Sequence, residues 1–348
     1  MKKNSCKHNP DLHPESWKRV STFPSEVQPV AQAILGWLPD EYLFSLVVRN
    51  HTYWGYPSPA QTIEVLFGKR MERADFLGMD AVEILVARTQ GRLGSPLEIF
   101  ENHTLLRFYQ VFMRQKERER YFTVRQDFSA QLKFPMALWN GNFTTNHPLR
   151  ACASCIEEDE ANFGMPYWHL QHQYPGACIC LKHQTVLQQT LVTPSSLQRF
   201  LFHTPVLASL APPPAIHKQS KKTFWELALI IQNLTADIQA GIAALESFRN
   251  RFVTFVADSG LLAPTGGLLV FDKVQVQSLC ESFVQATKQL SLVNDYNGVS
   301  TSTYSVHHTL SSYIKGKRSI YVMEQIALVF WFRTLPFWTE EDELEWVS

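Results

Sequence analysis

The stretch CASCIEEDEANFGMPYWHLQHQYPGACICLKH, residues 152–183, holds four of the six cysteines of this 348-residue chain. It begins with Cys152-x-x-Cys155 and ends with Cys180-x-x-His183. A two-residue gap lets both side chains of a tight turn face one ion, and two such turns supply the four tetrahedral ligands that Zn²⁺ prefers. The spacing therefore predicts one zinc ion, bound by Cys152, Cys155, Cys180 and His183.

The predicted zinc ion has a structural role. Three thiolates and one imidazole fill a tetrahedral shell and leave no position for water or substrate, so the ion would hold this segment folded. Three neighbouring residues are alternative ligands, namely Cys178, His169 and His172. Cys178 is the strongest of them, because a Cys-x-Cys pair can also close a site. Buried free cysteines beside surface histidines are the alternative without metal.

The composition is that of a globular protein. Hydrophobic residues make up 45% and charged residues 18% of the chain, which allows a substantial buried core. The formal net charge is zero, so contacts with nucleic acid must come from local basic patches. No segment has the length of a secretory signal or a membrane span. We therefore expect a cytoplasmic protein, in which clustered cysteines indicate metal rather than disulfides.

The rest of the chain is predicted to be mainly α-helical, because apolar residues recur at helical spacing on both sides of the cysteine cluster. In the C-terminal part, residues 223–260 are predicted to form one long amphipathic helix that ends at Gly260. The expected units are a flexible leader at 1–28, an N-terminal helical domain at 29–148, a zinc-finger module at 149–200, a Pro- and Lys-rich linker at 201–222 and a C-terminal helical domain at 223–348.

The segment SPAQTIEVLFGKRMERADFLG, residues 58–78, has the length and the glycine break of a helix-turn-helix. Ser58 is the predicted N-cap, Pro59 occupies the first helical position, and Gly68 follows the last turn. The second helix of such a motif enters the major groove of DNA. A plain helical hairpin that stabilises the domain is the alternative.

Several motifs together resemble the TniQ/TnsD family of transposon target-selection proteins. The family's opening places a proline and an acidic residue before a helix that ends in an arginine, as in LPDEYLFSLVVRNHTYWGYPSPAQTIEVLFGKR at 38–70. Its Cys-x-x-Cys, Tyr-Trp-x-x-x-His and Cys-x-x-His-x-x-x-Leu motifs resemble LRACASC at 149–155, YWHLQHQYPG at 167–176 and CICLKHQTVL at 178–187. LGMDAVEILVART at 77–89 and the lack of a second cysteine-rich finger favour the TnsD-like branch.

The resemblance implies a bacterial, nucleoid-associated adaptor that is not an enzyme. Family members direct a transposon to its insertion site, either by reading an attachment sequence in double-stranded DNA or by riding on a Cascade complex with its guide RNA. They then recruit the AAA+ ATPase TnsC. The family's zinc ligands correspond to Cys152, Cys155, Cys180 and His183, although Ala153 stands where the family commonly has proline. A target-site selector of a Tn7-like transposon is the favoured function, and a Cascade adaptor that does not read DNA is the alternative.

Basic residues gather at several places where phosphates could be contacted. The run from Arg114 to Arg120 alternates in sign and is interpreted as a solvated helix face. Gly316 lies between Lys315 and Lys317 and would let the backbone there approach a phosphate closely. The candidate DNA contacts are Lys69, Arg70 and Arg73, then Lys218, Lys221 and Lys222, and finally Lys315, Lys317 and Arg318.

Overall fold

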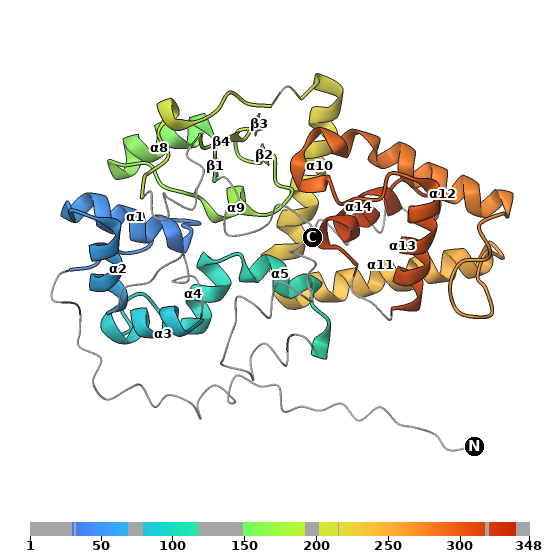
Figure 1. The fold of residues 1–348 in the computed structure, drawn as a ribbon, viewed down its shortest axis with the longest axis horizontal. Helices are drawn as coiled ribbons and strands as arrows, with labels where there is room; N and C mark the ends of the chain where they lie inside the picture. The colour runs from blue at the N-terminus through green and yellow to red at the C-terminus, as the bar shows by residue number, and fades with distance from the viewer. Residues whose placement is uncertain are drawn as a thin grey trace, which may run out of the picture.

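The computed structural model describes residues 30, 33–68, 79–116, 118, 149–191, 202–214, 216–316 and 320–338. Helices dominate this part of the chain, and the only extended pairs in it are short (Figure 1). The predicted mainly α fold with a central Cys₃His cluster is confirmed.

Two of the N-terminal helices begin at side-chain caps. The Ser58 hydroxyl accepts a hydrogen bond from the backbone N–H of Gln61, and Gly68 ends the second helix with φ 72°. Ser95 and Glu98 form a reciprocal capping box at the fourth helix. The helices are α1 (Leu43–Trp54), α2 (Pro59–Phe67), α3 (Met79–Arg88), α4 (Pro96–His103) and α5 (Leu106–Phe112).

Helices α2 and α3, the two members of the predicted helix-turn-helix, pack against each other. Arg88 of α3 donates hydrogen bonds of 3.1 Å and 2.8 Å to the Val65 carbonyl near the end of α2. This guanidinium satisfies a carbonyl that the helix end leaves without an intrahelical partner. The connection at 69–78 lies outside the described residues, and the candidate DNA contacts Lys69, Arg70 and Arg73 lie there.

The central module folds back so that its two ends meet. β1 pairs antiparallel with β4, and β2 pairs antiparallel with β3. Helix α8 follows β1 directly, and α9 lies between α8 and β2 in sequence. The elements are β1 (Arg150–Ala151), α8 (Ala153–Phe163), α9 (Leu170–Gln173), β2 (Ile179–Cys180), β3 (Thr185–Val186) and β4 (Gln188–Gln189).

The prediction of a single helix that ends at Gly260 is wrong, because the helix is interrupted at Asp237. The backbone of Asp237 is extended, and its carboxylate caps the next helix by accepting a 2.7 Å hydrogen bond from the Ala240 N–H. A Cβ on Gly241 would collide with the Leu234 carbonyl, so glycine permits the close contact of the two helices. The elements here are α10 (Lys218–Ala236), α11 (Ile238–Asp258), α12 (Val274–Thr287), α13 (Thr303–Lys315) and α14 (Val322–Phe332), with 3₁₀ segments η3 (Leu207–Ser209), η4 (Lys288–Leu292) and η5 (Asn294–Tyr296).

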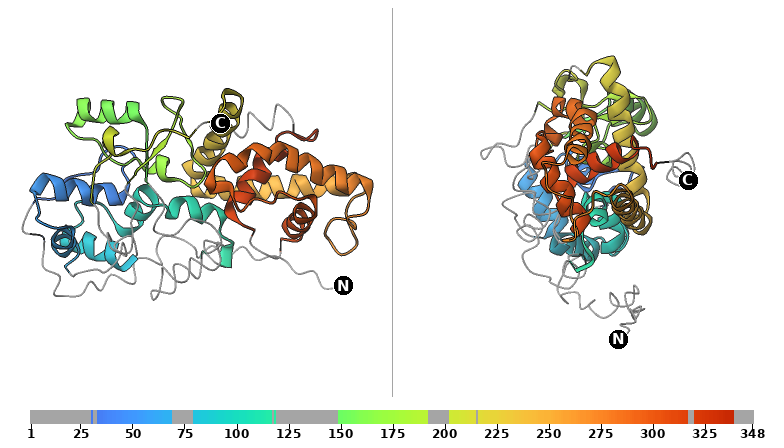
Figure 2. Two further views of the ribbon diagram at one scale, coloured as in Figure 1. Left: turned by 45° about the horizontal axis from the view of Figure 1, so that its top comes forward. Right: turned by 90° about the vertical axis from the view of Figure 1, so that its right-hand side faces the viewer.

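Helix α10 begins at Lys218, so residues 218–222 of the segment predicted as a linker form its first turns. Helix α5 packs against α10 and α11 (Figures 1 and 2). Arg107 of α5 donates to the carbonyls of Thr235 and Ala236 at the end of α10. One cluster of buried apolar side chains extends from Tyr42 to Leu335. The N-terminal helices, the central module and the C-terminal helices therefore share a single core.

Candidate metal centre

Two local structures bring the four predicted ligands together. Cys152 is the N-cap residue of α8, and Cys155 lies in the first turn of that helix. Cys180 ends β2, and His183 lies in the turn between β2 and β3. The N–H of Gln184 closes this turn with a 2.7 Å hydrogen bond to the Cys180 carbonyl, and Gln184 has a positive φ of 52°.

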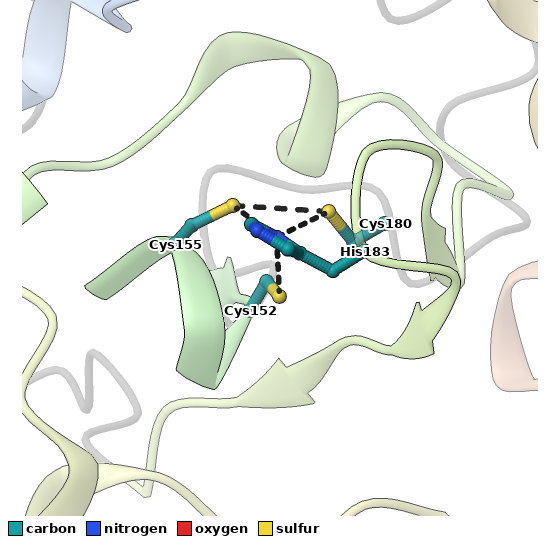
Figure 3. Close-up of side chains that lie close together, drawn as sticks. All are labelled: Cys152, Cys155, Cys180 and His183. Carbon is teal, nitrogen blue, oxygen red and sulfur yellow. Dashed lines mark hydrogen bonds between the residues drawn. The ribbon is translucent and has the colours of Figure 1, made fainter. Parts of the chain in front are cut away.

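The ligand atoms of these four residues all lie within 4.8 Å of one another (Figure 3). His183 Nδ1 is 3.5 Å, 3.3 Å and 3.6 Å from the sulfurs of Cys152, Cys155 and Cys180, and the last two sulfurs are 3.7 Å apart. Zinc bonds of ~2.3 Å to sulfur and ~2.0 Å to nitrogen at tetrahedral angles place sulfur and nitrogen ~3.6 Å apart and two sulfurs ~3.8 Å apart. The donor set therefore fits zinc at these positions.

Glu158 fixes the orientation of the imidazole. Its Oε1 lies 3.0 Å from His183 Nε2, and its other carboxylate oxygen pairs with Lys182. A carboxylate can only accept, so Nε2 carries the hydrogen and Nδ1 presents its lone pair to the thiols. This role of Glu158 was not predicted from the sequence. A signal existed, since Glu158 follows Cys155 by three positions and shares its helix face.

The three clustered thiols are buried and interact with one another. Hydrogen bonds from Cys155 and Cys180 lower the pKa of Cys152, and the hydrogen bond to Cys152 raises the pKa of Cys155. The contacts among the three thiols thus favour the thiolate at Cys152 over that at Cys155. Metal binding requires the remaining thiol protons to leave, so affinity falls as pH is lowered.

Cys178, the strongest alternative ligand, lies outside the cluster. Its thiol donates to the Gly176 carbonyl at 3.3 Å, and its side chain belongs to the main helical core. Burial raises the pKa of Cys178 to about 12, which keeps the thiol protonated. The cluster contains Cys180 instead.

The two alternative histidines have other surroundings. His169 Nε2 is 3.0 Å from an Asp159 oxygen, and its Nδ1 is 3.8 Å from Asp40 of the N-terminal region. His172 is buried, and burial lowers its pKa to about 3, so its imidazole is neutral. It lines a pocket of about 120 Å³ between the central module and α10. Neither histidine belongs to the Cys₃His group.

A buried ion pair anchors the module to the C-terminal helices. Arg150, two positions before Cys152, pairs with Asp295 of η5 and donates a 2.6 Å hydrogen bond to the Ala177 carbonyl. Asp295 also accepts a 2.7 Å hydrogen bond from the Gly176 N–H. A Cβ on Gly176 would lie 2.6 Å from the Tyr296 hydroxyl, so this approach requires glycine. The segment before Cys152 and the segment before Cys180 therefore both contact η5.

The candidate DNA-contact lysines that the structure describes occupy two places. Lys221 and Lys222 lie in the early turns of α10, which Lys218 begins, and the Lys222 ammonium is 3.8 Å from Glu226. Gln289 Nε2 donates a 2.6 Å hydrogen bond to Thr223 Oγ1, which places η4 and its exposed Lys288 beside these turns.

Lys315 ends α13, and its side-chain stem lies over Gly267. Lys317 and Arg318 lie outside the described residues. Lys288 was not predicted from the sequence, because no other cation is near it along the chain.

Comparisons with known proteins relate part of this chain to one family. The TniQ family model matches residues 34–187, from just before α1 to just after β3. The transposon Tn7 transposition protein TnsD of Escherichia coli is 24% identical over 149 residues. That alignment covers 41% of this chain and 29% of the relative, so the chain matches under a third of that relative's length. The family match includes all four residues of the Cys₃His cluster.

Proposed function

Because this chain belongs to the TniQ/TnsD family, with a TniQ domain at 34–187, we propose that it is the target-site selector of a Tn7-like transposon. It binds double-stranded DNA at the attachment site and recruits the AAA+ ATPase TnsC, which directs insertion. The observation that carries this proposal is the family match, since it spans the N-terminal helices and the whole Cys₃His cluster. The similarity to TnsD supports the attachment-site branch.

The Cys₃His cluster is proposed to hold one structural zinc ion. When bound, zinc would tie the start of α8 to the turn between β2 and β3. With four protein ligands it has no open position for a substrate, which supports a targeting role rather than catalysis. Glu158 orients His183, and the Arg150–Asp295 pair holds the module against the C-terminal helices.

Direct contact with DNA phosphates is proposed for the basic residues of the C-terminal region. Lys221, Lys222 and Lys288 lie around the early turns of α10, although Glu226 neutralises part of this charge. Each lysine that contacts a phosphate adds affinity that depends on salt and not on sequence. These contacts would orient the protein on DNA, while other groups read the bases.

The function is tested by mapping transposon insertions in cells that carry the transposon with or without this chain. We expect insertions to concentrate at one attachment site when the chain is present and to lose that concentration when it is absent. Insertions that stay at the site in its absence would contradict the proposal.

The second candidate is an adaptor that couples Cascade to the ATPase without reading DNA itself. The zero net charge favours it, because no global positive field draws the protein to DNA. Purification of the chain from cells that contain Cascade separates the two. A stable complex with Cascade, together with guide-dependent insertion, would establish the adaptor instead.

A further inference from the structure

Helix α13 carries two sets of polar side chains, and the first set bonds within the protein. His307 Nε2 lies 2.8 Å from the Leu269 carbonyl, and Ser311 Oγ accepts a 3.2 Å hydrogen bond from a backbone N–H of the loop before α12. Thr309 Oγ1 donates a 3.0 Å hydrogen bond to the buried carboxylate of Glu324. These groups hold the helix in place, so their hydrogen-bonding capacity is already used.

The second set makes no hydrogen bond or ion pair with the other described residues. Tyr304 is 72% exposed, His308 and Lys315 are exposed, and Ser312 is partly exposed. Successive residues of an α-helix are about 100° apart, so these four side chains begin within about 80° of one another around the axis of α13. We name the four residues the outer face of α13.

The segment that contains α13 has positive but no negative side chains. Residues 296–323 include no aspartate or glutamate, and Arg249 donates hydrogen bonds to two backbone carbonyls at the end of the helix. The loop at 268–273 beside α13 adds no net charge, because its one aspartate and one lysine offset each other. The outer face therefore does not repel phosphates. The cations within 296–323 are Lys315, Lys317 and Arg318.

Other described helices lack such a face. In α3, the second helix of the predicted helix-turn-helix, four of the eight residues from Ala81 to Arg88 are buried. The others include the carboxylate of Glu83 and the Arg88 guanidinium, which is bonded to Val65. Helix α12, which packs against α13, exposes the carboxylate of Glu281. Of these three helices, α13 is the one whose exposed polar groups suit contact with DNA.

The outer face has the chemistry of a base-reading surface. An α-helix fits the major groove of B-DNA, where base edges present hydrogen-bond donors and acceptors, and hydroxyl and imidazole groups can pair with either kind. The 13 residues of α13 give it a length of about 20 Å, which exceeds the groove width of about 12 Å. The helix lies in the half of the molecule away from α1, α2 and α3 (Figures 1 and 2).

We propose that α13 is the helix that reads base pairs of the attachment site. Tyr304 and His308 contact base edges in the major groove, and Lys315 contacts a phosphate at the rim of the groove. This inference rests on the proposed function and names the element that supplies its sequence specificity.

The test measures the dissociation constants of the purified full chain for attachment-site DNA and for random DNA of equal length. The variant Tyr304→Ala/His308→Ala should bind the attachment site at least about tenfold more weakly, because base contacts are lost. Its affinity for random DNA should stay within about twofold of wild type, with an unchanged salt dependence, because phosphate contacts remain. The control Gln239→Ala/Ser278→Ala removes exposed polar side chains of α11 and α12 and should change neither constant by more than about twofold.

Single base-pair substitutions across the attachment site add a readout that a folding defect would not produce. Base pairs that Tyr304 or His308 contacts should matter to wild type, and their substitution should not weaken the double variant further. Lys315→Ala should instead weaken binding to both DNAs alike and lower the salt slope by about 0.9.

An unchanged preference of the double variant for the attachment site, or an equal loss of affinity for both DNAs, would overturn the role of α13 and leave the proposed function intact. A wild-type chain without any preference for the attachment site would contradict the proposed function itself. Loss of ATPase binding by the double variant with unchanged DNA preference would assign the outer face to a protein partner, and would also overturn the proposal.

Discussion

Glu158 Oε1 lies 3.0 Å from His183 Nε2, and this contact turns the other ring nitrogen toward three cysteine sulfurs. The carboxylate comes from α8 and the imidazole from the turn after β2, so the contact joins the two halves of the metal centre. Glu158 also pairs with Lys182, which limits the positions that its carboxylate can adopt. Metal affinity should therefore depend on a residue that is not itself a ligand.

Replacement of Glu158 by alanine should lower zinc affinity by about 10- to 100-fold, because His183 loses the partner that sets its tautomer and orientation. Competition with a chromogenic chelator measures this change. Glu160→Ala is the matched control, since Glu160 is exposed on the same helix. Equal zinc affinity of Glu158→Ala and wild type would contradict the role given to Glu158.

Elemental analysis distinguishes Cys180 from Cys178. Cys180→Ser should lose zinc, because its sulfur is one of four converging donors. Cys178→Ser should keep one zinc per chain, because its thiol faces the Gly176 carbonyl in the helical core. Loss of zinc from Cys178→Ser with retention in Cys180→Ser would show that Cys178, and not Cys180, is the zinc ligand.

The Arg150–Asp295 pair should matter for folding. Asp295→Ala leaves the Arg150 guanidinium buried without its counter-charge, which should lower the free energy of unfolding by about 3–5 kcal/mol. Chemical denaturation with zinc present measures this. Lys222→Ala, which removes the exposed contact with Glu226, should cost less than about 1 kcal/mol. Similar losses in the two variants would contradict the anchoring role of Asp295.

Asp40 should make stability depend on pH in a direction unusual for a carboxylate. Burial raises its pKa from the usual value of 3.8 to about 6. Between these values the folded protein holds a proton that the unfolded chain has lost, so the contribution of Asp40 to stability is present below pH 3.8 and falls as pH rises to about 6.

Unfolding measured from pH 4 to 7 tests this, with Asp40→Asn as the comparison. Asparagine tolerates the positive φ of 53° at this position and can still accept the Gln171 N–H. The variant should lose the decline that wild type shows between pH 4 and 6. An identical pH profile for both proteins would mean that Asp40 keeps an ordinary pKa.

Local signals predicted much of this structure. Ser58, Pro59 and Gly68 gave the limits of α2, since each acts on the backbone next to it. The two-residue spacings identified the four clustered side chains, because a short turn constrains where both members point. The break at Asp237 was missed, because apolar periodicity continues on both sides of a single capping residue.

Contacts between distant segments could not be predicted in this way. Arg150 and Asp295 are 145 positions apart, and the residues next to them in sequence do not indicate that the two side chains pair. Lys288 is isolated in sequence, and its neighbour Gln289 bonds to Thr223 of α10 in the folded chain. Such pairings depend on how helices pack, and local charge or hydrophobic patterns do not contain that information.

The most informative measurement is a salt titration of the dissociation constant of the purified chain for attachment-site DNA and for random DNA of equal length. We expect the attachment site to be preferred at moderate salt, and the plot of log affinity against log salt to lose a slope of about 0.9 for each phosphate-contacting lysine replaced by alanine at positions 221, 222 and 288. Equal dissociation constants for both DNAs at every salt concentration would contradict direct reading of the attachment site.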